Sequence, residues 1–210
     1  MKKQFITTLL ILLSYTAIAQ NETNKKESKL ELIINGKLGF AKLNQTGAVS
    51  LNGNINASDI LLAYKISSKW DIATGIGFLQ FNANPTLAGN TANLVNHYLH
   101  IPIQFNGEYN LFHGEESKDQ KVFLIICGGF YANTLLKQEL ETISGSSEAK
   151  NLGWNFGIET QVGAKFVVTN SLNISLGLDS QGDLTKMKKD GNEQRIQQLN
   201  ALFFKLGLKF

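Results

Sequence analysis

The sequence has few of the residues that mark several common protein classes. It contains 1 cysteine and 2 prolines among 210 residues, and its net charge is only +3. A single cysteine excludes an internal disulfide framework, and the scattered lysines form no basic stripe of the kind that nucleic-acid binding requires. Beyond the first twenty or so residues there is no apolar run of about 20 residues, which excludes a helical membrane protein.

The sequence also lacks the local motifs of catalytic and cofactor sites. It contains no glycine-rich phosphate loop, no cluster of metal ligands and no nucleophile elbow. His97 and His100 are three positions apart, which on a strand places them on opposite faces and makes them a poor metal pair. His113 falls in a predicted turn, and Cys127 falls in an apolar strand where a packed, inert thiol is expected. We therefore expect no cofactor, no metal ion and no enzymatic activity.

The first residues predict export. Two lysines precede the apolar run Phe5–Leu13, and an A-I-A motif marks a cleavage site before Gln20. The apolar run has about nine residues, against the roughly 20 that span a bilayer, so it is typical of a secretory signal peptide. We predict a signal peptide at residues 1–19 and a flexible polar lead-in at residues 20–29, whose composition offers no apolar anchor.

The remainder of the sequence alternates between apolar and polar residues, a pattern typical of strands with two different faces. The last stretch, Leu202–Phe210, reads L-F-F-K-L-G-L-K-F and carries its large apolar residues mainly on one parity. Eight such segments fall within a single predicted domain at residues 30–210. They lie at residues 30–43, 58–67, 70–82, 94–109, 121–136, 152–168, 171–182 and 196–210.

The predicted connections between these segments alternate in length. Tight turns are expected at Ser67–Lys69 and Thr169–Asn170, with a medium connection at residues 110–120 on the same side. The other connections are longer and polar, at residues 44–57, 83–93, 137–151 and 183–195. With eight strands, both ends of the domain lie on the side of the short turns, as in outer-membrane barrels.

Two features favour a membrane barrel over a soluble, lipocalin-like barrel, which would also alternate. The polar parity is rich in glycine, alanine, serine and asparagine, which suit a crowded interior. The apolar parity carries more large side chains than a narrow eight-stranded interior can hold. We predict an all-β fold, an eight-stranded antiparallel up-and-down transmembrane β-barrel, with Trp70, Tyr109 and Phe210 at the membrane interface.

The polar parity also carries charges of both signs, which a narrow interior tolerates only when they are paired. We therefore predict an ion-pair and hydrogen-bond network that plugs the interior in place of an open pore. Its predicted members are Glu31, Lys37, Lys65, Asp71, Glu108, Glu159, Lys165, Asp179 and Lys205. Lys209, near the rim, is expected to be solvated.

Several stretches resemble the PorT-like outer-membrane β-barrel family. They are Y-L-H-I-P-I at 98–103, G-G-F-Y at 128–131, L-G-L-K-F at 206–210 and A-I-A-Q at the end of the predicted signal peptide. The resemblance extends over the predicted mature chain and implies an eight-stranded barrel in the outer membrane without catalytic residues. The aromatic Phe210 further resembles the signal that the barrel-assembly machinery reads.

Four functions stay open from the residues alone. The first is a structural or interaction barrel, embedded in outer-membrane lipid, that presents external loops to an unidentified protein partner. The second is a narrow channel for small solutes. The third is a lipid A-modifying enzyme that uses His100 near Gln104 and Glu108. The fourth is a soluble lipocalin-like carrier.

Overall fold

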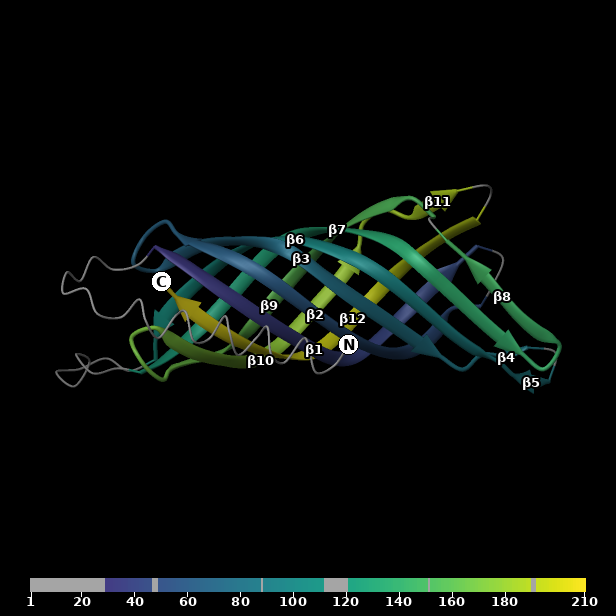
Figure 1. Ribbon diagram of the computed structural model, residues 1–210, viewed down its shortest axis with the longest axis horizontal. Helices are drawn as coiled ribbons and strands as arrows, with labels where there is room; N and C mark the ends of the chain where they lie inside the picture. The colour runs from purple at the N-terminus through teal and green to yellow at the C-terminus, as the bar shows by residue number, and fades with distance from the viewer. Residues whose placement is uncertain (1–28, 47–48, 88, 112–120, 151, 190–191) are drawn as a thin grey trace.

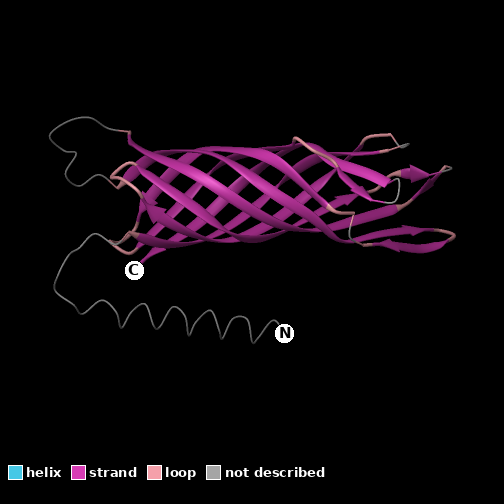
Figure 2. Ribbon diagram, turned by 90° about the horizontal axis from the view of Figure 1, so that it is seen from above, coloured by secondary structure: helices cyan, strands magenta, loops and turns pink. Residues whose placement is uncertain are grey.

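The structure is a computed structural model that describes residues 29–46, 49–87, 89–111, 121–150, 152–189 and 192–210 (Figure 1). The predicted signal peptide, nearly all of the predicted lead-in and His113 lie outside the described residues. The described chain is built from β-strands and connecting turns, as Figure 2 shows. Within these ranges no helix is both long and apolar enough to cross a membrane.

Eight long strands form one closed antiparallel ring. They are β1 (Leu30–Gln45), β2 (Leu51–Lys65), β3 (Trp70–Ala83), β6 (Asn93–Asn110), β7 (Val122–Thr142), β9 (Trp154–Val167), β10 (Leu172–Asp183) and β12 (Asn192–Lys209). Each pairs with the next long strand along the chain, and β12 pairs with β1 to close the ring. The predicted eight-stranded, antiparallel up-and-down barrel is confirmed.

Four short strands extend from one end of the ring. They are β4 (Thr86–Leu87), β5 (Asn90–Thr91), β8 (Gly145–Ala149) and β11 (Met187–Lys189). In Figure 1 they gather at the end opposite to the C-terminus, whereas the short turns lie at the end that holds the C-terminus. The two ends of the barrel are therefore different, and we call them the head end and the turn end.

The register of the pairings fixes the tilt of the strands. Following directly paired residues once around the ring leads from Glu31 through β2, β3, β6, β7, β9 and β10 to Leu199 on β12. The partner of Leu199 on β1 is Ala41, not Glu31. The path thus returns to β1 at Ala41, displaced along the strand from its starting residue, Glu31. In a ring of eight strands, this displacement corresponds to a strand tilt of about 40° from the barrel axis.

The large apolar side chains of the alternating rows point outward. Leu38 and Phe40 are 66% and 73% exposed, whereas Lys37, next to Leu38 on the opposite parity, is 2% exposed. The same holds on the other strands, for example at Phe78 and Leu202. This arrangement is the reverse of a soluble barrel, whose apolar side chains face inward, so the lipocalin-like alternative is wrong.

The outward apolar rows form a band of limited height. On β1 the band runs from Leu30 to Phe40, and the next outward residue is Lys42. About ten residues at about 3.3 Å each, tilted by about 40°, give a height of about 25 Å. This equals the apolar band of outer-membrane barrels. Trp70 and Tyr109 pack edge-to-face at its turn end, with ring centroids 6.0 Å apart.

Beyond the band the strands continue, but there the apolar side chains face inward and the polar side chains face outward. Leu43 and Phe81 point inward there and are 0% exposed, while the outward residues such as Asn54 are polar. The inward apolar side chains form one cluster, which we call the head core. Its larger members are Leu43, Ile55, Leu79, Phe81, Leu94, Tyr98, Leu135, Leu152, Met187, Ile196 and Leu199.

Three of the long connections predicted from the sequence are therefore wrong. Residues 44–57 are predicted as a loop, but β2 already begins at Leu51. Residues 137–151 are also predicted as a loop, but β7 continues to Thr142 and forms a hairpin with β8. Residues 183–195 are predicted as a loop, but β11 lies within them and β12 already begins at Asn192. The reason is the head core: inward apolar side chains such as Ile55 stabilise strand pairing above the band.

Candidate functional site

An ion cluster occupies the middle of the barrel interior. Lys37 Nζ lies 3.0 Å from Asp179 Oδ2, 3.2 Å from Asp59 Oδ2 and 3.6 Å from Glu159 Oε2. The four side chains come from β1, β2, β9 and β10, and each is 1% exposed or less. All four point inward because they occupy the inward parity of their strands. We call this group the Lys37 cluster.

Amide side chains surround the Lys37 cluster. Their hydrogen bonds run from Asn35 Nδ2 to Asp59 Oδ2 (3.0 Å), from Gln161 Nε2 to Asp179 Oδ2 (3.0 Å) and from Gln181 Nε2 to Asp179 Oδ2 (3.2 Å) and Glu159 Oε2 (3.4 Å). Three carboxylates face one ammonium, so the cluster carries excess negative charge. The amide donors stabilise that charge, because a buried carboxylate is costly unless its oxygens accept hydrogen bonds.

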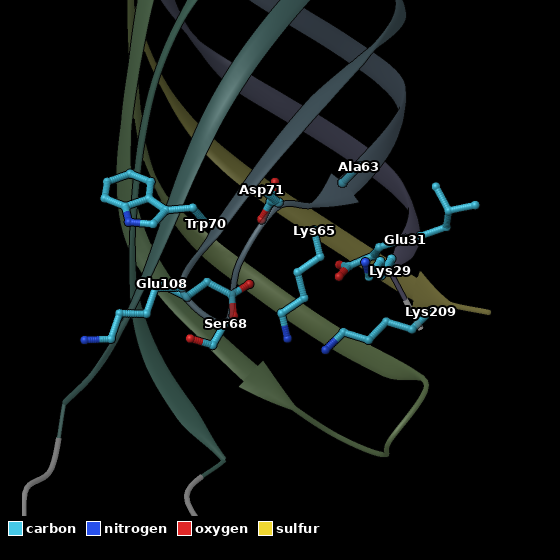
Figure 3. A pocket seen from close by; sticks show the side chains of 11 residues that line it. Lys29, Glu31, Ala63, Lys65, Ser68, Trp70, Asp71, Glu108 and Lys209 are labelled. Carbon is cyan, nitrogen blue, oxygen red and sulfur yellow. The ribbon is translucent and has the colours of Figure 1, made fainter. Parts of the chain in front are cut away.

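A second network lies at the turn end, around the mouth of the barrel. Lys165 Nζ lies 2.5 Å from Glu108 Oε1 and 3.5 Å from Glu31 Oε2, and Asn173 Nδ2 donates to Glu31 Oε1 at 2.9 Å. Asp71 Oδ1 accepts a hydrogen bond of 2.7 Å from Asn106 Nδ2. Figure 3 shows three of these carboxylates, those of Glu31, Asp71 and Glu108, with lysines around them. We call this group the mouth network.

The remaining predicted lysines occupy different environments. Lys65 lies directly opposite Asp71, and Lys209 directly opposite Glu31, on neighbouring strands at the mouth. Lys205 is buried, and its Nζ lies 5.2 Å from the ring centroid of Phe203. The cation and the aromatic face attract each other, which offsets part of the cost of burying the charge. The residues predicted as one network therefore lie in two separate clusters, with Lys205 between them.

Sequence reasoning missed Asp59. The predicted segment 58–67 contains Asp59, but the predicted members of the network do not include it. Asp59 shares its parity with Ala63 and Lys65, so it continues the inward row of β2. That shared parity was the available signal. Which carboxylates meet Lys37 depends on the closure of the ring, which no linear pattern contains.

His100 does not form the catalytic arrangement that the sequence left open. It faces the interior, is 2% exposed, and its Nδ1 lies 2.7 Å from Asn133 Oδ1. Glu108 lies eight positions away on the same strand, about 26 Å along it, and pairs with Lys165 at the mouth. The alternative of a lipid-modifying site at His100, Gln104 and Glu108, which the sequence left open, finds no support in this geometry, since the outer rows, not His100, face lipid.

The described residues offer no group of three or more histidine, cysteine, aspartate or glutamate side chains that could hold a metal ion. Cys127 points inward and is buried. The mouth opens into a space of about 20 Å³, room for about one water molecule. The interior is thus filled at three levels: the mouth network, the Lys37 cluster and the head core.

A close contact of one aromatic side chain with two glycines adds to this filling. Phe203 is buried, and its ring lies over Gly163 and Gly177, which face each other on β9 and β10. A Cβ atom on Gly177 would lie 2.9 Å from Phe203 Cε1 and 2.2 Å from the Val162 carbonyl oxygen. Only a residue without a side chain leaves room for the ring here.

The sequence matches no protein-family model and no curated protein. Among solved structures, the chain is similar to Neisserial surface protein A (NspA), with a TM-score of 0.53 and 13% identity over 87% of this chain and 98% of that chain. It is also similar to the outer membrane protein OprG from Pseudomonas aeruginosa, with a TM-score of 0.53 and 11% identity over 88% of this chain and 98% of that chain. At these identities the likeness establishes the eight-stranded barrel fold alone. Membership of the PorT-like family stays a prediction.

Proposed function

We propose that the protein is an integral outer-membrane barrel that acts as a structural or interaction protein and presents its head outside the cell. In this proposal the interior does not conduct and no reaction is catalysed. The observation that carries it is the closed interior: the Lys37 cluster lies beneath the head core, and both are buried.

The outward band supports placement in a membrane. Its height of about 25 Å matches the apolar band of outer-membrane barrels, and Trp70 and Tyr109 lie at its turn end, where interfacial aromatics are common. Short turns face the periplasm in such barrels and longer segments face outside. By this rule the head is external. Export by the predicted signal peptide belongs to the same proposal.

The filled interior supports a non-conducting barrel over the narrow-channel alternative. An ion crossing the barrel would have to displace the Lys37 ion pairs and then enter the apolar head core. The first step leaves buried charges unpaired, and the second removes the ion from water, and both are costly. The head core would have to open before any solute passed.

The head supports a role in interaction. β8 pairs with β7 but with no other described strand, so its second edge is open. The charged pairs of Lys137 with Glu139 and Glu148 lie beside it, and charges of this kind limit edge-to-edge aggregation. Hydrogen bonds with these two glutamates raise the pKa of Lys137, and Lys137 lowers the pKa of Glu139. The partner is proposed to be another protein of unidentified type.

Two measurements test the proposal. After expression, membrane and soluble fractions are compared for a band whose gel mobility shifts on boiling, as folded membrane barrels do. We expect this band in the outer-membrane fraction, and recovery in the soluble fraction would exclude the membrane assignment. In planar bilayers we expect no conductance steps from the purified barrel. Regular steps at every insertion would favour the channel alternative.

Phe210 is proposed to contribute to recognition by the barrel-assembly machinery. Its side chain is 58% exposed at the turn end, and its backbone N–H donates to the Leu30 carbonyl at 3.4 Å. Replacing Phe210 with alanine should reduce the outer-membrane yield. Leu208→Ala, which removes an outward apolar side chain from the end of β12, is the control. Equal yields for both variants would reject a specific role for Phe210.

A further inference from the structure

A shallow polar hollow lies on the outer surface where the apolar band ends. It has a volume of about 380 Å³ and lies over the neighbouring strands β12, β1 and β2. We call it the amide hollow. Its outward side chains are Phe40, Lys42, Asn52, Asn54, Gln198 and Asn200.

The register arranges these side chains in two rows across the strands. Phe40 on β1 has Asn54 of β2 and Asn200 of β12 directly opposite it. Lys42, two positions further toward the head, has Asn52 and Gln198 opposite. Directly paired side chains on one face of a sheet lie about 4.5–5.5 Å apart at Cβ. Each row is therefore compact enough for one ligand to contact all three of its members.

The charge of the amide hollow favours an anion. Lys42 is exposed and, within the described ranges, no carboxylate lies at ion-pairing distance from it. By contrast, Lys186 and Lys188 of the head pair with Glu193 at 2.8 and 2.9 Å. The other members of the hollow are neutral, so Lys42 leaves it with a positive charge that a phosphate would complement.

The neutral members favour a sugar beside that phosphate. Asparagine and glutamine side chains each offer both donors and an acceptor, as sugar hydroxyls require. Only one of the amides has a side-chain partner in the described chain: Asn200 Oδ1 accepts from Ser180 Oγ at 3.0 Å, which leaves its NH₂ group directed elsewhere. Phe40, 73% exposed at the last level of the band, would contact the acyl region next to the headgroup.

We propose that the amide hollow binds the phosphorylated sugar headgroup of a glycolipid of the outer leaflet. Lys42 holds the phosphate, the amides of β2 and β12 bind sugar hydroxyls, and the acyl chains lie along the outward row of Phe40 and Leu38. The inference rests on the proposed external position of the head. It adds a ligand of defined chemistry, because the leaflet that faces outward in an outer membrane is built from phosphorylated glycolipid.

The test is retention of defined lipids by the purified barrel in detergent, measured by native mass spectrometry. The lipids are bisphosphorylated lipid A, dephosphorylated lipid A and phosphatidylglycerol. Wild-type protein should retain bisphosphorylated lipid A most strongly. Lys42→Glu should weaken that retention by about tenfold, the value of one charge-assisted hydrogen bond. Asn54→Leu should weaken retention of both lipid A forms, since it removes a sugar contact.

Lys69→Glu is the matched control, because Lys69 is an exposed lysine at the turn end. It should leave retention unchanged. Every variant is first checked for the mobility shift of a folded barrel. Equal retention of lipid A by folded wild-type and Lys42→Glu protein would overturn the proposal, as would equal retention of phosphatidylglycerol and lipid A. Failure of the proposed function is distinguishable, since it is read from fractionation and not from lipid affinity.

Discussion

Lys37 Nζ and Asp179 Oδ2 lie 3.0 Å apart in the centre of the barrel, although β1 and β10 do not pair with each other and β12 runs between them. The ion pair therefore connects two strands across the interior. Gln161 and Gln181 donate to the same Asp179 oxygen, so the contact also links β9 to this point. A single side chain, Lys37, thus pairs with carboxylates contributed by three other strands.

Replacing Lys37 with methionine should destabilise the barrel by about 3–5 kcal/mol, because Asp59, Glu159 and Asp179 would stay buried without a cation. The measurement is urea unfolding in lipid vesicles, followed by the mobility shift on gels. Lys69→Met is the control, and at an exposed site it should change stability by no more than about 0.5 kcal/mol. An unchanged urea midpoint for Lys37→Met would contradict a charged cluster.

Replacing Gly177 with alanine should destabilise the barrel by about 1–3 kcal/mol through overpacking against Phe203 and the Val162 carbonyl. Gly128 is the matched control, since it also lies inside a long strand but has no atom within 4 Å of the position that an added methyl group would take. Gly128→Ala should be neutral or slightly stabilising. The measurement is the urea midpoint of unfolding of each variant. Equal midpoints for the two variants would show that the Phe203 ring moves aside without cost.

Introducing arginine at Leu178 tests the lipid-facing band. Leu178 points outward and is 59% exposed in the middle of the band. In lipid, Leu178→Arg should cost about 2–4 kcal/mol of folding free energy. Asn54→Arg places the same charge outward on β2 but at the head end of the band, opposite Phe40, and its cost should be about 0–1 kcal/mol. Similar costs at the two positions would mean that Leu178 does not face hydrocarbon.

The pH dependence of Glu193 tests the charged tip of the head. Hydrogen bonds from Lys186 and Lys188 lower the pKa of Glu193 to about 2. Because the folded pKa lies below the unfolded value, the contribution to stability is present at neutral pH and is lost as pH falls toward 2. Carboxyl NMR should show a midpoint well below the ordinary glutamate range. Lys186→Gln combined with Lys188→Gln should raise that midpoint, and about 0.5 M salt should raise it partly.

The parity of apolar residues was sufficient to predict the eight strands within the apolar band and the side that faces lipid. In Leu202–Phe210 the outward row follows directly from the alternation. Because the side chains of that row are too large for a narrow interior, they indicated that the row faces lipid. The head was missed, although its signal was present. On β3 the apolar parity changes between Phe78, which points outward, and Phe81, which points inward. A change of parity of this kind marks the level at which the surroundings change from lipid to water.

Within the apolar band, the sequence by itself determined which residues lie in strands and which parity faces inward, because both follow from the two-residue period of an extended chain. Only the tertiary structure decided which inward charges meet. Ring closure brings Lys37 to Asp59, Glu159 and Asp179 and places Lys165 beside Glu31 and Glu108. The offset that leads from Glu31 around the ring to Ala41 sets the level of every side chain. That offset arises from pairing between distant strands, which local alternation does not encode.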